Sequence, residues 1–300
     1  MPGVVPQVLQ LPLVVLVSAV AGAVNAFAGG GTLLTFPALV GLGIPPVVAN
    51  ATSTVALWPA ALGSMWGYRR ELSGARAWAV RFALPSVAGG LAGALLLLFT
   101  PASTFSAVVP WLVLGATLLF MLQGPLMRAL RRRRGAQRAP SRAVSAGPAT
   151  ASRGVSDAAP DASSQVPPAD RPAEGTGEAL RPPHSVALFY QFLVAVYGGY
   201  FGAGIGILML AALGFMGLTN IHRMNGLKNW GGLCINAVAA ATFAVSGLVN
   251  WPVALSMAAG STLGGYGGSG LAQRVRQESV RKGIVAVGLG SSLWLALDRF

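Results

Sequence analysis

Long apolar stretches, separated by short polar or glycine-rich links, follow one another along most of the chain. Most are about 20 residues long, which is the length that a helix needs to cross the hydrocarbon core of a bilayer. A membrane-spanning segment must satisfy its own backbone hydrogen bonds, so helices are expected rather than open sheets. The pattern therefore predicts an all-α polytopic membrane protein with about eight transmembrane helices. The stretches cover residues 11–42, 47–68, 78–99, 105–127, 186–216, 225–249, 252–272 and 283–297.

Glycine-rich breaks interrupt the first apolar stretch of each half of the chain. One break covers residues 29–32 (GGGT), and the other covers residues 202–206 (GAGIG). The apolar segment after each break has about 12 residues, which is too few for a helix to cross a bilayer alone. We therefore expect glycine-broken segments that either re-enter the membrane or form part of one crossing.

A polar segment divides the chain. Residues 136–183 are rich in Ala, Pro, Ser, Asp and Arg and contain almost no large apolar side chains. Such a segment cannot bury a core and is expected to be disordered. An arginine cluster precedes this segment, and together they form a predicted disordered basic linker at residues 128–183. It separates a first membrane repeat at residues 11–127 from a second at residues 184–300.

The two halves carry the same features in the same order. A shift of 174 residues without gaps places residues 25–30 on residues 199–204, and so places one glycine break on the other. The same shift places residues 50–68 on residues 224–242. Few residues are identical, but the shared order predicts an internal repeat.

Positive charge predicts how the halves are oriented. Basic residues gather at residues 69–81, 128–138 and 274–282, and cytoplasmic links of membrane proteins are enriched in Lys and Arg. With these links inside, residues 50–68 run inward while residues 224–242 run outward. We therefore predict two inverted repeats, a recurring design of secondary transporters. The same reasoning predicts a multi-pass protein whose linker is cytoplasmic.

The composition agrees with a bilayer location, and the distribution of basic residues argues against reading the net charge as a nucleic-acid-binding surface. Only 10% of residues are charged and 54% are hydrophobic, whereas soluble domains have about 25% charged residues. The net charge of +13 could suggest nucleic acid, but 10 of the 21 basic residues lie between Arg128 and Arg181. We therefore expect the lipid bilayer as a partner and no nucleic acid. The single cysteine, Cys234, excludes an intrachain disulfide framework.

Acidic side chains are almost missing from the apolar stretches. None of the eight Asp and Glu residues lies deep in one, so neither an intramembrane proton relay nor an acid-lined cation path is expected. Lys228 does lie inside an apolar stretch, and a lysine in the bilayer costs about 2.5–3.5 kcal/mol. An anion is its natural partner. The alternative is that Lys228 snorkels to the lipid headgroups.

Catalytic and metal-binding groupings are not visible in the sequence. The two histidines, His184 and His222, are separated and have no acid or thiol cluster beside them, so no metal site is expected. No set of nucleophile and base can be argued either. We therefore predict a protein that is not an enzyme and needs no cofactor.

Two groups of residues are candidates for binding an anion. Polar and small residues follow the second break at helical spacing, on one face, and Asn50 lies in the matching zone of the first half. The glycine breaks can expose backbone N–H groups at a helix start, where the helix dipole attracts anions. The alternative for both groups is hydrogen bonding and close packing between helices. The candidate substrate-binding residues are Asn25, Gly29, Gly30, Gly31, Thr32, Asn50, Thr52, Ser53, Gly202, Gly204, Gly206, Asn225, Lys228, Asn229 and Asn236.

Several segments together resemble the motifs of the sulfite exporter TauE/SafE family. They are residues 21–46 (AGAVNAFAGGGTLLTFPALVGLGIPP), 49–53 (ANATS), 223–229 (RMNGLKN) and 249–255 (VNWPVAL), followed by the glycine-rich residues 260–270. The resemblance implies a multi-pass permease of the cell (inner or plasma) membrane, with about eight helices, that exports or exchanges small sulfur-containing anions such as sulfite or organosulfonates. The chain departs from the pattern in its long linker and in the Ala and Ile residues within its second glycine break.

The sequence thus favours a secondary carrier for a small anion that works by alternating access between inverted repeats. An anion channel and a non-transporting membrane scaffold, whose basic linker docks on lipid or a partner, remain the alternatives. The expected partner is a small anionic substrate, and the sequence leaves the formation of a homo-oligomer open.

Overall fold

The computed structural model describes residues 7–27, 30–67, 76–138, 185–215, 218, 221–271 and 277–297. This part of the chain forms ten α-helices and contains no strand, so the all-α prediction is confirmed. The first half contributes α1 (Gln7–Phe27), α2 (Thr32–Gly41), α3 (Pro46–Gly67), α5 (Arg76–Phe99) and α6 (Ala102–Arg138). The second half contributes α8 (Ser185–Tyr200), α9 (Ile205–Phe215), α10 (Ile221–Val245), α11 (Trp251–Leu271) and α12 (Gln277–Leu297).

Two segments of this bundle, Ala77–Phe99 and Ala102–Leu122, are long and apolar enough to cross a membrane by themselves. Five further apolar helices, in α1, α2, α8, α9 and α12, are shorter. Glycine, proline and polar residues within the other helices lower their hydropathy, as the Asn and Lys residues of α10 illustrate. The count of about eight spans therefore stays a prediction.

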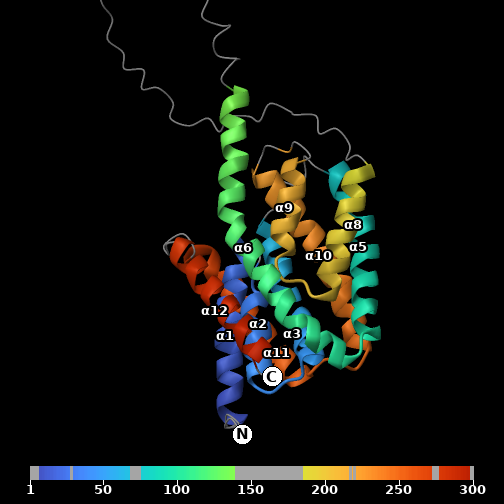
Figure 1. Cartoon of the computed structure of the whole chain (residues 1–300), viewed down its shortest axis with the longest axis vertical. Helices are drawn as coiled ribbons and strands as arrows, with labels where there is room; N and C mark the ends of the chain where they lie inside the picture. The colour runs from blue at the N-terminus through green and yellow to red at the C-terminus, as the bar shows by residue number, and fades with distance from the viewer. Residues whose placement is uncertain are drawn as a thin grey trace, which may run out of the picture.

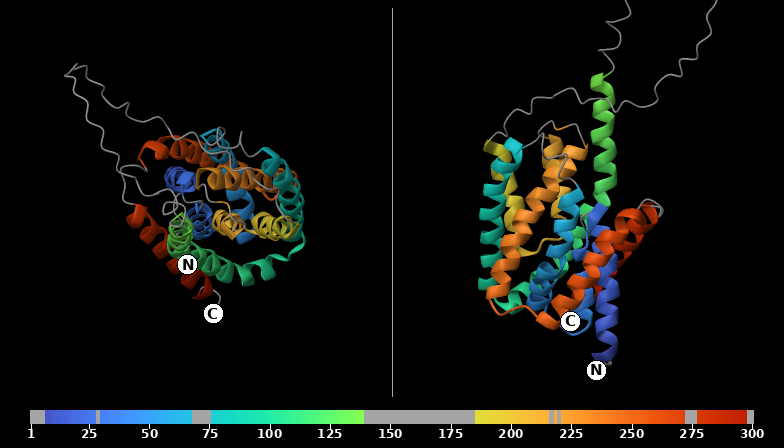
Figure 2. Two further views of the ribbon diagram at one scale, coloured as in Figure 1. Left: turned by 90° about the horizontal axis from the view of Figure 1, so that it is seen from above. Right: turned by 180° about the vertical axis from the view of Figure 1, so that it is seen from behind.

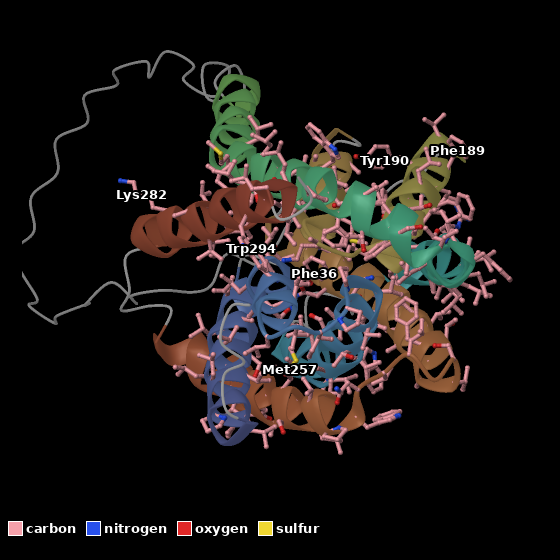
Figure 3. All side chains as sticks on the ribbon, turned by 60° about the horizontal axis from the view of Figure 1, so that its bottom comes forward. Phe36, Phe189, Tyr190, Met257, Lys282 and Trp294 are labelled. Carbon is pink, nitrogen blue, oxygen red and sulfur yellow. The ribbon has the colours of Figure 1, made fainter. Side chains whose placement is uncertain are left out.

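The outer surface of the bundle is strongly apolar. Leu84 is 76% exposed, Phe99 82% and Val245 87%. Phe189 likewise projects from the rim in Figure 3, whereas Phe36 lies inside. Apolar surface costs about 25 cal/mol per Å² in water, and large apolar patches mark surfaces that meet a membrane or another protein. The exposed side chains are consistent with a bundle surrounded by lipid.

The two ends of the bundle are distinguished by their links. The link from α2 to α3, the link from α5 to α6 and the link from α10 to α11 meet at one end, called the lower end because it is at the bottom of Figure 1. At the upper end, α3 finishes, and α5, α8 and α10 begin. Apart from Lys228, which is buried in α10, the Lys and Arg residues of the described helices belong to segments on the upper side: the starts of α5, α10 and α12 and the projecting end of α6.

Each glycine break is the tip of a helical hairpin. Helix α1 starts at the lower end, and after its break α2 returns there, so that Val14 and Leu39 share one core cluster. Helix α8 starts at the upper end, and α9 returns there, with Leu210 and Leu213 packed beside Leu188. The two hairpins thus enter the bundle from opposite ends. This geometry favours the re-entrant alternative for both broken segments.

Close helix pairs link one half of the chain to the other. Helix α1 packs along α11, and α8 packs along α5. At both contacts glycine is required, because a Cβ on Gly22 or Gly264 would overlap the facing backbone, as would one on Gly93 or Gly199. Small residues permit such approaches between membrane helices. The first helix of each half is therefore held by the fourth helix of the other.

Three further helix contacts also join a helix of one half to a helix of the other. Helix α3 packs on α11, α10 packs on α5, and α6 packs on α12. The 174-residue shift also carries the starts of α2, α3, α5 and α6 to within one residue of the starts of α9, α10, α11 and α12. Figure 2 shows the interlocked bundle from above and from behind.

Helix α6 is longer than its counterpart α12 and projects beyond the upper end of the bundle (Figures 1 and 2). Residues 128–138, where the linker was expected to begin, therefore belong to a helix. Arg, Ala, Leu and Gln are good helix formers, which explains the continuation. The rest of the expected linker lies outside the described residues.

Candidate functional site

A cavity of about 70 Å³ lies where the two hairpin tips meet, at the mid-height of α3 and α10. One water molecule needs roughly 10–15 Å³ of such space, so the cavity can hold a small ion with some water. It is lined by both halves of the chain. The lining residues are Asn25, Thr32, Thr54, Leu57, Ala61, Phe201, Gly202, Ile205, Gly206, Met209, Lys228, Asn229, Gly232, Leu233 and Asn236.

Lys228 supplies the positive charge of this cavity. Its side chain is only 6% exposed, so it does not extend freely to the headgroup region as the snorkelling alternative requires. Helices α1 to α11 contain no Asp or Glu, and within the described residues no ion pair to Lys228 is formed. A cation buried without a counter-ion is costly. The cavity therefore favours an anionic occupant.

Asn229 adds a second group that lacks a partner. Its Nδ2 atom is buried and donates no hydrogen bond to any described residue. An unsatisfied buried donor costs about 1–3 kcal/mol, and Asn229 lines the cavity beside Lys228. Two adjacent donors without acceptors are suited to a ligand that brings oxygen acceptors.

Two short helices begin at the cavity. Thr32 is the first residue of α2, and Ile205 is the first residue of α9; both line the cavity. The first N–H groups of a helix have no acceptor within the helix, and its dipole places about half a positive charge there. The cavity thus lies between two helix ends that favour negative charge.

The turn before α9 depends on glycine. Gly202 has a φ of +82° and Gly204 a φ of +80°, a left-handed conformation that only glycine adopts without strain. Carbonyl oxygens of the turn are already engaged, because Gly204 accepts the N–H of Ile207 at 3.0 Å. The turn therefore ends α8 and starts α9 within a few residues.

Part of the cavity wall is apolar. Leu57 and Ala61 come from α3, Met209 from α9 and Leu233 from α10. An apolar wall lowers the local dielectric constant and strengthens the attraction between Lys228 and an anion. It also offers no acceptor that would compete for the lysine.

Seven of the fifteen predicted candidates line this one cavity. Helix α10 brings Lys228, Asn229 and Asn236 together on one face, as its spacing predicted. The segments around the two glycine breaks contribute the other four residues. The predicted residues that line the cavity are Asn25, Thr32, Gly202, Gly206, Lys228, Asn229 and Asn236.

Three predicted residues of α3 lie outside the cavity lining and bond to neighbouring segments. Asn50 Nδ2 donates to the carbonyl of Tyr200 at 2.9 Å. Thr52 Oγ1 accepts the backbone N–H of Asn250 at 3.0 Å, and Ser53 shares a 2.6 Å hydrogen bond with Thr35. These contacts match the packing alternative, in which polar residues join membrane helices.

The other candidates also lie away from the lining. A Cβ on Gly30 would meet the ring of Phe120 at 2.8 Å, and Gly31 is equally enclosed by α1. Gly204 faces Ala116 of α6. Asn225 is part of α10 but does not line the cavity. Gly29 lies outside the described residues.

Sequence reasoning placed Thr54 in the zone of the first half that matches the polar face of α10, but it selected neither Thr54 nor the apolar wall as a candidate. Thr54 is the residue that the 174-residue shift places on Lys228, and this correspondence could have identified it. Its hydroxyl donates to the carbonyl of Asn50 at 2.9 Å, which leaves its lone pairs free. The apolar wall carried no such signal, because Leu57 and Met209 look like any core residue in a membrane helix.

Comparison with known proteins identifies the family. A family model described as "Sulfite exporter TauE/SafE" matches residues 14–295, which confirms the resemblance seen in the motifs. No solved structure matches the chain.

Three curated relatives match along nearly the whole chain. "Probable membrane transporter protein YfcA" of Escherichia coli (strain K12) is 26% identical over 300 residues, covering 97% of this chain and 91% of that protein. "Probable membrane transporter protein ORF9" of Sinorhizobium sp is 25% identical, covering 93% and 89%. "Probable membrane transporter protein" of Haemophilus influenzae is 24% identical, covering 96% and 95%.

Proposed function

The chain belongs to the sulfite exporter TauE/SafE family, and from this premise we propose that it is a secondary transporter that carries a small anion across the cell membrane. The observation that carries this proposal is the burial of Lys228 in a cavity lined by donors and free of acid. A lysine in this position is costly unless an anion compensates it. Family membership supports a transport function, and the buried lysine in the cavity supports a negatively charged substrate.

The strength of the attraction is adequate for a transient site. Two unit charges 4 Å apart attract each other by about 4 kcal/mol at an effective dielectric constant near 20. Part of this offsets the dehydration of the anion. The donor of Asn229 and the starts of α2 and α9 then contribute hydrogen bonds and partial charge. The result is binding that selects an anion but allows its release.

For the substrate we propose sulfite, an organosulfonate or a related sulfur-containing anion. The name of the family model supports this class. Tetrahedral or pyramidal oxyanions present several acceptors within a small volume, and the cavity is lined by Lys228 and Asn229 of α10 and by the first residues of α2 and α9. A cavity of about 70 Å³ also restricts the site to small cargo.

We further propose that the two halves are inverted repeats and that transport occurs by alternating access. The hairpins enter from opposite ends, and their tips meet at the cavity. The two halves also make equivalent contacts with each other: α1 packs on α11, and α8 packs on α5. Transporters of this design bind substrate near the midplane, where helices are broken. The basic upper end would face the cytoplasm by the positive-inside rule.

The test is anion flux in proteoliposomes. Wild-type protein should show saturable uptake of sulfite, and Lys228→Ala should abolish it because the charge is lost. Lys282→Ala is the matched control, since Lys282 is exposed near the start of α12, away from the cavity (Figure 3). Equal flux in Lys228→Ala and wild type would overturn the site. Single-channel currents in place of saturable exchange would replace the carrier by a channel.

A further inference from the structure

The glycine residues of the turn between α8 and α9 add little rigidity to it. Gly202 and Gly204 both have positive φ angles, and glycine moves between such conformations easily. The start of α9 nevertheless has to face the cavity steadily if its N–H groups are to bind an anion. Groups outside the turn must therefore hold it.

Two side chains hold carbonyl groups of this turn. Asn50 Nδ2 donates to the carbonyl of Tyr200 at 2.9 Å, and the Tyr197 hydroxyl donates to the carbonyl of Ala203 at 2.8 Å. Asn50 comes from α3 in the first half and is 1% exposed. Tyr197 lies one turn before the end of α8. The turn is thus bonded on both sides of Gly202.

These bonds fix the direction of the neighbouring N–H groups. In a trans peptide the C=O of one residue and the N–H of the next point in opposite directions. With the Ala203 carbonyl directed to Tyr197, the N–H of Gly204, just before the first turn of α9, points away from Tyr197. Ile205 and Gly206 of that same turn line the cavity. The N–H groups of Phe201 and Gly202 are already used by the carbonyl of Tyr197, at 2.9 and 3.3 Å.

We propose that Asn50 and Tyr197 are positioning residues, which hold the start of α9 so that its unpaired N–H groups remain available to the anion. Neither side chain lines the cavity, so they act through the backbone of residues 200–206. This assigns Asn50 a different role from the direct contact that its sequence position predicted. The expected effect of these residues on anion affinity rests on the proposed function. Their expected effect on the conformation of the turn rests on geometry alone.

The experiment compares Tyr197→Phe and Asn50→Leu with Ser292→Ala. Ser292 is the matched control because its hydroxyl also donates to a carbonyl of another helix, that of Pro110, at 2.9 Å but remote from the cavity. Sulfite flux in proteoliposomes gives KM and maximal rate, and hydrogen exchange measures protection of residues 200–208. Tyr197→Phe removes only an oxygen, so it provides a folded variant if Asn50→Leu does not fold.

For the two positioning variants we expect KM to rise about tenfold, the effect of losing roughly one hydrogen bond, with maximal rate within about twofold. Exchange across residues 200–208 should accelerate, and Ser292→Ala should change neither quantity. Wild-type KM and exchange in Tyr197→Phe would overturn the inference. Absence of flux in wild type would instead refute the proposed function, and hydrogen exchange would then still decide whether the two side chains hold the turn.

Discussion

The ring of Phe36 in α2 meets the ring of Phe201, in the turn before α9, edge to face, with 5.3 Å between centroids and 79° between planes. The two residues belong to the two hairpins, so the contact joins the tips that enter from opposite ends. Phe201 also lines the cavity. The aromatic pair therefore packs α2 against the turn that borders the cavity.

Removal of this aromatic contact should be costly for stability. Phe36 is fully buried, and a buried Phe→Ala substitution costs about 3–5 kcal/mol through lost burial and the cavity left behind. We expect Phe36→Ala to lower the thermal unfolding temperature of purified protein in detergent by many degrees. Phe99→Ala is the control because Phe99 is 82% exposed; it should leave the temperature nearly unchanged. Similar shifts for the two variants would contradict the packing.

The contact between α1 and α11 leads to a second prediction. A Cβ at Gly264 would overlap the carbonyl oxygen of Ala19, so Gly264→Val should force the helices apart. Overpacking commonly costs about 1–3 kcal/mol and more where backbone blocks relaxation. We expect a large loss of monodisperse protein in size-exclusion chromatography. Gly290→Val, where the added side chain meets open space, should elute as wild type does; equal losses would show that the close approach is unimportant.

Much of the fold follows from local sequence. Long apolar stretches predicted the helices, and the 174-residue shift anticipated the corresponding starts of α2 and α9. The path of the broken segments could not be predicted, because a run of about 12 apolar residues fits a re-entrant hairpin and a partial crossing equally well. Which one forms depends on tertiary contacts such as Leu210 and Leu213 against Leu188, far apart in sequence.

The sequence could identify those residues of the candidate site whose side chains are unusual in an apolar helix. Lys228 and Asn229 stood out because charge and amides are costly in an apolar helix. Asn50 stood out for the same reason, but only the structure shows that its amide bonds to Tyr200 and not to the cavity. A polar residue in a membrane helix is conspicuous in sequence, whereas the direction in which it points depends on the packing of its neighbours.

Asn229 allows the donor role to be tested without a change of size. Asn229→Asp replaces the unpaired Nδ2 by a carboxylate oxygen beside Lys228, so the cavity loses a donor and its net positive charge. We expect sulfite-dependent thermal stabilisation to disappear. Asn229→Leu should retain weakened stabilisation, with affinity lower by about tenfold for one lost hydrogen bond.

The control for this pair is Asn250→Asp, at the lower end of the bundle near Thr52 and away from the cavity. It introduces the same charge change in the same protein. Its sulfite response should remain that of wild type. A normal response in Asn229→Asp would show that the cavity does not bind the anion through this position.

Lys228 should affect stability and binding in opposite directions. The substitution Lys228→Met keeps most of the side-chain volume and removes a buried cation that has no acidic partner among the described residues. Because a lysine in an apolar span costs about 2.5–3.5 kcal/mol, we expect the anion-free variant to unfold at a higher temperature than wild type. Sulfite should then give no further increase, whereas Lys228→Arg should retain part of it. A lower unfolding temperature for anion-free Lys228→Met would mean that the lysine stabilises the bundle itself, and the argument for an anionic cargo would lose its basis.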